Sequence, residues 1–337
     1  MKRHVWRLAK RPEGDIADGD LVYREEDIPA LADGEVLVET IYLSLDPTNR
    51  IWMSDQEQYM PPVEIGAPMR GGIAGRVVDS RAAGFDAGDI VAGLGEWATH
   101  IVARPPMIAK LPPIPGVPLA AAFGTFGVVG PTAYHGLLEI GQPQPGEVLV
   151  VSAAAGGVGQ IVGQIGKLKG CTVIGIAGGA DKCAWITGEL GFDHAIDYKA
   201  EDVGAALDRL APDGIDINFE NVGGEIMDAI IRRMKLFGRV ALCGLISQYN
   251  EDDGTPDPVP GYWTMMLMRR LTVRGFIVTD FADRQAEMLQ ELGGWMAAGK
   301  IKTRQDIRKG LDRADDHVKL LYSGGNFGKL LVEVSPE

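Results

Sequence analysis

One stretch of the chain, Glu147 to Gly170, constrains the fold more than any other. It begins with a short apolar run, Val148 to Val151, which is typical of a strand buried on both faces. A turn of small residues follows, and beyond it apolar residues recur at the spacing of one helix face. That predicted face consists of Val158, Ile161, Val162, Ile165 and Leu168. A strand, a small-residue turn and a helix in this order present unpaired backbone amides to a pyrophosphate group.

The turn has the pattern Ala153-x-x-Gly156-x-x-Gly159 in place of the commoner G-x-G-x-x-G. A glycine triplet alone is weak evidence, because a tight turn that binds no ligand has the same composition. Here, however, a second predicted strand, Cys171 to Ile176, follows the helix at the spacing of one βαβ unit. The sequence therefore predicts a dinucleotide site. Its turn residues are Ala153, Ala155, Gly156, Gly157, Val158 and Gly159.

Length and charge exclude several classes of protein. The 337 residues are enough for two domains of ordinary size. A formal net charge of −13 argues against nucleic acid or an anionic membrane as a partner, since both require a basic face. No apolar run approaches the ~20 residues that span a bilayer. The three cysteines, Cys171, Cys183 and Cys243, form no C-x-x-C motif and no disulfide ladder, so the expected compartment is the cytoplasm.

Two patterns divide the chain. Up to about residue 120 it consists of short predicted strands separated by turns, as in a barrel-like β unit. The clearest of these strands are Glu35 to Leu45, Gly71 to Asp79, Ile90 to Leu94 and Ala98 to Ala103. A proline-rich segment, Arg104 to Pro118, predicts a rigid crossing between domains.

From Glu147 onward strands and helices alternate, which predicts a parallel sheet covered on both faces. The predicted elements include a helix from Glu225 to Met234, a strand from Thr272 to Val278 and, near the end of the chain, a short helix from about Ala314 to Leu321. Residues 250 to 261 predict a loop. The last predicted strand, Lys329 to Val334, has no βαβ partner nearby, so we expect it to rejoin the N-terminal β unit.

Seven segments together resemble the zinc-independent branch of the medium-chain dehydrogenase/reductase superfamily. They are Tyr42 to Pro47, Ala153 to Gly159, Gly163 to Cys171, Asn221 to Gly224, Cys243 to Asn250, Gly275 to Val278, and Gly325 to Lys329. That branch contains prostaglandin reductases (leukotriene B4 dehydrogenases), plant alkenal double-bond reductases and bacterial curcumin reductase, which the chain resembles most.

The resemblance implies an α/β fold in two parts. A GroES-like β-rich catalytic domain would span residues 1–125 and be completed by residues 300–337. A doubly wound Rossmann domain would span residues 126–299 and bind NADPH. The implied reaction is hydride transfer from NADPH to the β-carbon of an α,β-unsaturated ketone or aldehyde, in a homodimer. The alternatives are a quinone reductase of the same superfamily and an NADPH-binding protein without turnover.

One segment departs from the family pattern. The family usually follows Asp-Pro with Tyr-Met-Arg-Gly-Arg-Met, whereas this chain has Thr48-Asn-Arg-Ile-Trp-Met53. If the segment lines the substrate cleft, Ile51 and Trp52 give the cleft a different and more apolar shape. The family's substrate range therefore does not carry over.

The choice of cofactor is argued from charge. An NAD site usually places an acid near the end of the second strand, to accept from the ribose 2′-hydroxyl. That acid is missing from Ala177 to Ala180, and Lys182 follows, where it can meet a 2′-phosphate. Asp181 either pairs with Lys182 or faces solvent. By resemblance Lys182 and Tyr198 hold the adenosine phosphate end of the cofactor. The alternatives are that Lys182 is an ordinary solvated lysine and that Tyr198 is a tyrosine that only packs.

The remaining cofactor residues follow from strand ends and from the resemblance. Asn221 ends a predicted strand, where its amide can bond a ribose or phosphate oxygen, unless it only forms a turn. The resemblance places a backbone shelf under the nicotinamide and Asn326 on its far wall. The shelf and its neighbours are Cys243, Gly244, Ile246, Ser247, Tyr249, Phe276, Ile277 and Val278.

Catalysis is expected without a metal, because the histidines are dispersed and Arg70-Gly-Gly stands where zinc relatives have Gly-His-Glu. Tyr59 matches a functional tyrosine of the curcumin reductase branch, and its phenol can donate to the developing enolate. It is equally explained as a packing loop residue. The tyrosine of prostaglandin reductases falls on Met268, which leaves Tyr262 as the rival proton donor.

Overall fold

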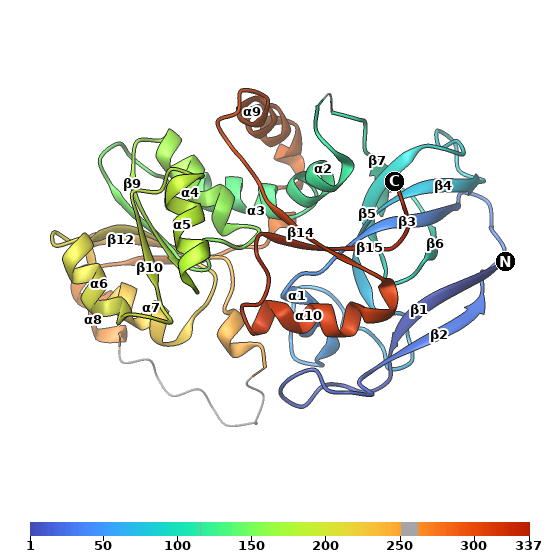
Figure 1. The fold of residues 1–337 in the computed structure, drawn as a ribbon, viewed down its shortest axis with the longest axis horizontal. Coiled ribbons are helices and arrows are strands. Elements are labelled where there is room, and N and C mark those ends of the chain that lie inside the picture. Colours follow the sequence, from blue (N-terminus) through green and yellow to red (C-terminus); the bar gives the residue numbers. More distant parts are fainter. Residues whose placement is uncertain (115, 251–261) are drawn as a thin grey trace.

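The computed structural model describes residues 1–114, 116–250 and 262–337, arranged in two halves that lie side by side (Figure 1). One half is built on a parallel six-stranded sheet, and the other on a seven-stranded mixed sheet with a separate two-stranded hairpin. Nearly all of the loop predicted at residues 250–261 lies outside the described residues. Among the described residues, no helix has the length and apolar character needed to cross a membrane.

The parallel sheet has the strand order β10-β9-β8-β11-β12-β13. Its strands are β8 (Val148–Val151), β9 (Thr172–Ala177), β10 (His194–Asp197), β11 (Ile215–Glu220), β12 (Met234–Leu242) and β13 (Thr272–Gly275). The chain starts in the middle at β8, winds outward to β10, and then returns to β11 on the other side of β8. Ligands of such doubly wound sheets bind where the winding reverses. The predicted fold class is confirmed in this half.

Helices cover both faces of this sheet, as the alternation of strands and helices predicted. They are α3 (Val129–His135), α4 (Gly159–Leu168), α5 (Ala180–Gly188), α6 (Val203–Leu210), α7 (Gly224–Ile231), α8 (Trp263–Arg269) and α9 (Gln285–Ala297). Alternate residues of β8 point to opposite faces: Leu149 and Val151 join the core beneath α3, α4 and α9, whereas Val150 joins the core beneath α6 and α7. The position of the glycine turn is therefore fixed between two apolar cores.

Two element boundaries differ from the sequence prediction. The helix expected to reach Met234 ends at Ile231, because Met234 already pairs with Ile215 at the start of β12. The strand expected to reach Val278 ends at Gly275, because the Asp280 carboxylate accepts from the Ile277 amide and begins a short helical turn (Val278–Arg284). In the first case strand pairing with Ile215, and in the second a hydrogen bond within the chain, overrides the helix or strand pattern of the local sequence.

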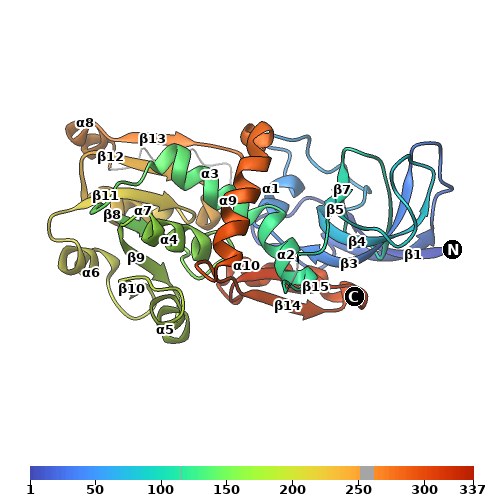
Figure 2. The same cartoon turned by 90° about the horizontal axis from the view of Figure 1, so that it is seen from above.

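The mixed sheet has the order β14-β15-β3-β4-β5-β7, and β6 also pairs with β3. Its strands are β3 (Val36–Ser44), β4 (Arg70–Ser80), β5 (Ile90–Glu96), β6 (His100–Ala103), β7 (Ile108–Lys110), β14 (Gln305–Lys309) and β15 (Lys329–Glu333). The C-terminal strand β15 runs antiparallel to β3, which confirms the prediction that it rejoins the N-terminal unit. Both views show β14 and β15 beside β3 (Figures 1 and 2).

The structure also contains elements that the sequence did not predict. The proline-rich segment includes β7, which pairs with β5. Short helices α1 (Thr48–Met53) and α2 (Leu119–Phe126) follow β3 and the proline-rich segment. In contrast, α10 (Ala314–Tyr322), which precedes β15, agrees with the short helix that the sequence predicts near Ala314 to Leu321.

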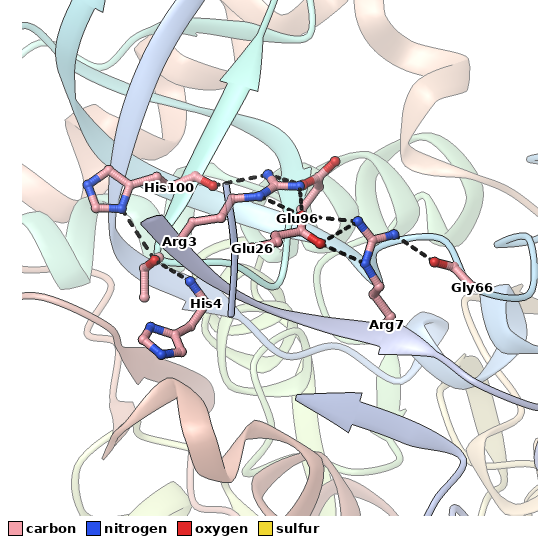
Figure 3. Close-up of polar contacts among 8 residues, drawn as sticks. Arg3, His4, Arg7, Glu26, Gly66, Glu96 and His100 are labelled. Carbon is pink, nitrogen blue, oxygen red and sulfur yellow. Dashed lines mark hydrogen bonds and ion pairs between the residues drawn. The ribbon is translucent and has the colours of Figure 1, made fainter. Parts of the chain in front are cut away.

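The N-terminal hairpin, β1 (Lys2–Leu8) and β2 (Leu21–Asp27), is joined to the mixed sheet by buried charge. Glu26 lies between the guanidinium groups of Arg3 and Arg7, each with a nitrogen 2.7 Å from a carboxylate oxygen (Figure 3). Arg3 also reaches Glu96 of β5 at 2.7 Å. Because Arg3 is buried, these partners compensate the loss of its hydration and fix the hairpin on the sheet.

Candidate active site

A cavity of about 1040 Å³ lies between the two halves. One side is formed by the small-residue turn after β8 and by the loops that follow β9, β11 and β12. The other side is formed by Leu45 to Thr48, Ile51 and Tyr59 of the N-terminal half, together with residues next to β15. Its volume is at the upper end of the ~300–1,000 Å³ range of ordinary ligand sites, so it accepts a ligand of dinucleotide size.

All eighteen residues predicted to contact the cofactor line this one cavity. They are Ala153, Ala155, Gly156, Gly157, Val158, Gly159, Lys182, Tyr198, Asn221, Cys243, Gly244, Ile246, Ser247, Tyr249, Phe276, Ile277, Val278 and Asn326. Tyr59 lines the same cavity. Their convergence supports a shared site, while the role of each residue stays a prediction.

The turn after β8 has room for a ligand because its own backbone is folded tightly. The Gly156 amide donates to the Ala153 carbonyl at 2.9 Å, and Ala153 adopts a positive φ of 49°. A Cβ on Gly159 would lie 2.4 Å from the Ala153 oxygen, so only glycine fits there. The fingerprint thus reflects a backbone contact that brings the start of α4 against the strand.

The end of β9 is suited to a negatively charged group. Asp197, the nearby acid, accepts from the Gly179 amide at 2.8 Å. Lys182 lines the cavity, and its ammonium donates to the Gly324 carbonyl at 2.8 Å. Burial, and to a smaller degree the charge of Lys199, lower the pKa of Lys182, and the negative charge of a phosphate beside it would favour the charged ammonium. Asp181 is exposed, the second of its two expected arrangements.

The loop after β11 is held by a buried carboxylate. Glu220 accepts from the Ser152 hydroxyl and the Val222 amide, both at 2.7 Å. The Asn221 side-chain nitrogen donates to the Ser152 carbonyl at 2.7 Å. We expected this amide to bond the ligand, but its nitrogen is used within the protein, so a ligand contact falls to its oxygen.

The predicted nicotinamide shelf contains a neutral thiol and a phenol, and its predicted far wall contains an amide. Burial, followed by the charge of Glu220, raises the pKa of Cys243 to about 12, which keeps the thiol protonated. The Tyr249 hydroxyl accepts from the Leu245 amide at 3.1 Å, and burial raises the pKa of this phenol. Asn326 donates to the Gly328 carbonyl at 3.0 Å, which fixes its side chain beside β15.

Two residues with hydroxyl groups, Thr48 and Tyr59, line the cavity from the N-terminal half. The Thr48 and Tyr59 hydroxyl oxygens lie 2.5 Å apart and are hydrogen-bonded. Tyr59 is 44% exposed, so Thr48 supplies an orientation that packing alone does not. Thr48 is the first residue at which the chain departs from the family pattern, and the contact gives that departure a physical consequence.

Tyr262, the rival proton donor, is not among the residues that line the cavity. It immediately precedes α8 and packs against the core that includes residues of α7 and β12. Its pKa is raised by burial and, less strongly, by Asp228 and Glu220. The structure brings Tyr59, and not Tyr262, to the predicted cofactor residues.

Asp46, Tyr322 and Lys329 also line the cavity, and the sequence did not single them out. The Lys329 ammonium lies 2.6 Å from the Asp46 carboxylate and 2.8 Å from the Leu45 carbonyl. The Tyr322 hydroxyl donates to the Pro47 carbonyl at 3.0 Å. The only available signal was that Lys329 and Asp46 each belong to a motif that resembles the family.

In the part of the chain that the structure describes, no group of three or more His, Cys, Asp or Glu side chains is arranged to hold a metal ion. The absence of a metal from the reaction stays a prediction. Cys171, Cys183 and Cys243 are free thiols.

Comparison with known proteins places these features in a family. Residues 4–111 match a model described as the N-terminal domain of oxidoreductase, and residues 157–294 match one described as zinc-binding dehydrogenase. The chain is 42% identical to the NADPH-dependent curcumin reductase of Escherichia coli (strain K12), over 99% of this chain and 98% of that protein. It is 39% identical to a tobacco (Nicotiana tabacum) 2-alkenal reductase (NADP⁺-dependent), over 90% of this chain and 88% of that one.

A solved structure agrees over the whole fold. CurA from Vibrio vulnificus in complex with NADPH is 40% identical, with a TM-score of 0.92 over 99% of this chain and 100% of that one. The two-part fold with its inter-domain cavity defines an oxidoreductase of the medium-chain dehydrogenase/reductase type. The chain belongs to this superfamily, in the branch that contains these reductases.

Proposed function

We propose that the chain is an NADPH-dependent reductase of carbon–carbon double bonds conjugated to a ketone or aldehyde. The observation that carries the proposal is the single cavity that joins the turn after β8 and Lys182 to the hydroxyl pair of Thr48 and Tyr59. The named activities of the curcumin and 2-alkenal reductases support the same chemistry.

The chain's own residues fit the parts of NADPH. The turn from Ala153 to Gly159 and the start of α4 hold the diphosphate with backbone amides, and Lys182 and Tyr198 hold the 2′-phosphate end. When bound, the cofactor supplies a hydride to the β-carbon of the substrate.

Tyr59 then acts on the charge that this addition creates. As negative charge develops on the substrate's carbonyl oxygen, a neutral phenol that donates to it stabilises the transition state. Thr48 holds the Tyr59 hydroxyl in place through the 2.5 Å contact. The proton that completes the reduction passes from Tyr59 to the enolate oxygen, and the resulting enol rearranges to the saturated ketone or aldehyde. Tyr59 is exposed enough to regain a proton from solvent.

Two other functions share the fold. A quinone reductase would use the same cofactor site, and a nucleotide-binding protein would bind NADPH without turnover. The named activities of the curcumin and 2-alkenal reductases favour the enone reaction over both.

A direct assay tests the proposal. The purified chain is mixed with NADPH and cyclohexenone, crotonaldehyde or benzoquinone, and the loss of NADPH absorbance is followed with product identification. Cyclohexanone and butyraldehyde are the expected products, and dialysis against a chelator should leave the rates unchanged. Turnover of benzoquinone alone would assign the quinone function, and binding without any turnover would assign the third.

We also propose that the chain acts as a cytoplasmic homodimer. Among the residues that the structure describes, β13 forms the outer edge of the parallel sheet, with α8 beside it (Figure 2). Exposed apolar side chains gather on β12, α8 and β13, and we call them the β13 patch: Leu236, Phe237, Trp263, Leu267, Met268 and Val273. An unpaired edge strand with apolar neighbours is suited to pairing with a second copy. The three free thiols support the cytoplasmic setting.

The proposed domain limits follow the two sheets. Residues 1–125 with 300–337 contain the mixed sheet and the hairpin, and residues 126–299 contain the parallel sheet.

A further inference from the structure

Lys329, the first residue of β15, contacts one wall of the cavity with its stem. The preceding residue, Gly328, donates its amide to the Ala155 carbonyl at 2.9 Å and forms a β-bridge with Gly156. A Cβ added to Gly157 would lie 3.2 Å from the Lys329 Cδ. The side chain of Lys329 therefore lies directly on the turn that is proposed to hold the diphosphate.

The head of the same side chain contacts the opposite wall. Its ammonium donates to the Leu45 carbonyl at 2.8 Å and to the Asp46 carboxylate at 2.6 Å. The other Asp46 oxygen accepts from the Ser44 hydroxyl. The Asp46 amide donates to the Asn49 side-chain oxygen at 2.8 Å. Three hydrogen-bonding partners thus fix the position of Asp46, which lies two residues before Thr48.

Stability alone gives little reason for a lysine at this position. Lys329 is only 5% exposed, and a buried cation loses its hydration, so that an apolar residue of similar volume is often at least as stabilising as a buried ion pair. Burial lowers the pKa of Lys329, while Asp46 favours its charged form. What the ion pair adds is a contact of fixed direction between the start of β15 and the segment that contains Asp46.

We propose that Lys329 is a positioning residue. Through Asp46 it couples the turn at Ala155 to Gly157 with the segment that carries Thr48, and so sets the placement of the Thr48–Tyr59 hydroxyl pair relative to bound NADPH. The inference rests on the proposed function of the cavity. It assigns Lys329 no contact with the substrate. Because a misplacement of about 1 Å can slow catalysis roughly a hundredfold, the coupling has a measurable effect.

The first test separates turnover from cofactor binding. Lys329→Met removes the charge and keeps most of the volume, and Asp46→Asn removes the partner's charge. Each variant should lower kcat for cyclohexenone by about a hundredfold, while the Kd for NADPH, measured by tryptophan fluorescence, changes less than about threefold. Because the two residues act as one unit, the double variant should lose no more than either single variant. Lys329→Arg, which can still pair with Asp46, should recover part of the rate.

A matched control has an ion pair of similar length away from the cavity. Lys235 of β12 lies 2.8 Å from Asp216, and neither residue lines the cavity. Lys235→Met should keep kcat and the Kd for NADPH near the values of the unaltered protein. If Lys329→Met kept kcat within about threefold of that control, the proposed coupling would be wrong. A large rise in the Kd for NADPH with unchanged kcat would instead make Lys329 a cofactor ligand, and would also overturn it.

The second test needs no turnover. Amide hydrogen exchange of residues 46–53 is compared between the unaltered protein and Lys329→Met, with and without NADPH, using α6 as the internal reference. Faster exchange confined to residues 46–53 supports the coupling, and equal exchange refutes it. If the unaltered protein reduced no enone, the proposed function would fail while this measurement still decided the role of Lys329.

Discussion

Among single residues, Lys182 carries the sharpest expectation about cofactor choice. It lines the cavity and donates to the Gly324 carbonyl. The end of β9, the second strand of the parallel sheet, carries no acid that could accept from a free ribose hydroxyl. The nearby Asp197 accepts from the Gly179 amide instead. A charge-assisted contact to a 2′-phosphate contributes about 1.5–3 kcal/mol, or roughly tenfold to a hundredfold in affinity.

Lys182→Ala should therefore raise the KM for NADPH by at least about tenfold and leave the KM for NADH nearly unchanged. Both constants are measured on one enone, with the other substrate saturating. Equal losses for the two cofactors would remove the basis for assigning Lys182 to the 2′-phosphate.

Tyr59 carries the expectation about proton transfer. Tyr59→Phe removes one donor and little volume, so turnover of cyclohexenone should fall roughly a hundredfold, with NADPH affinity unchanged. Thr48→Val, which removes only the hydroxyl that holds Tyr59, should lower turnover in the same direction, and Thr48→Ser should restore most of it. Tyr262→Phe is the matched control, because Tyr262 does not line the cavity. If Tyr59→Phe keeps more than about half of the activity, the residue only packs.

The sequence was informative about which residues meet at the cavity and uninformative about how they do so. Motif positions such as Gly159 and Lys182 are carried by local patterns around strand ends. The orientation of the Asn221 amide depends on Ser152, and the Lys329–Asp46 pair joins residues 283 positions apart. Neither contact leaves a periodic or local signal, so only the folded arrangement shows it.

At the scale of elements, α4 shows how much a correct helix prediction leaves open. Its apolar periodicity placed the helix within a residue of the observed Gly159–Leu168. The periodicity did not explain the glycines inside it. A Cβ on Gly163 would lie 1.8 Å from the Phe192 ring. The absence of a side chain at Gly163 therefore allows α4 to pack closely against the segment between α5 and β10.

Gly163→Ala should consequently destabilise the protein, although alanine is the better helix former. Overpacking of a core typically costs about 1–3 kcal/mol, more than the ~1 kcal/mol that helix propensity returns. Gly188→Ala in α5 is the control, because a Cβ there meets nothing within 4 Å. Thermal unfolding should show a lower midpoint for Gly163→Ala and an equal or higher one for Gly188→Ala. A Gly163→Ala protein as stable as the unaltered one would show that Phe192 moves aside freely.

For the whole molecule, two independent patterns specified the architecture. Alternation of strands and helices predicted the parallel sheet, and the unpartnered final strand predicted its return to the N-terminal half, which the pairing of β15 with β3 confirms. The β1–β2 hairpin and β14 were not predicted. The hairpin is held to the sheet by Arg3 and Glu96, and β14 by pairing with β15, so both depend on partners that are distant or later in the chain.

The same architecture leaves β13 at a sheet edge, and the dimer prediction follows from that edge. Val273 lies on β13 and Leu267 on α8, both within the β13 patch, and neither lines the cavity. Charges on an edge strand and its apolar neighbours oppose pairing between copies.

Leu267→Glu combined with Val273→Glu should therefore convert a dimer into a monomer, with the Kd for NADPH changed by less than about threefold. Sedimentation velocity over a range of concentrations measures the mass of each variant. Met107→Glu, at an exposed apolar residue of the other half, is the control and should leave the dimer intact. If the unaltered protein sediments with the mass of one chain, or the double variant remains a dimer, the two copies do not associate through β13.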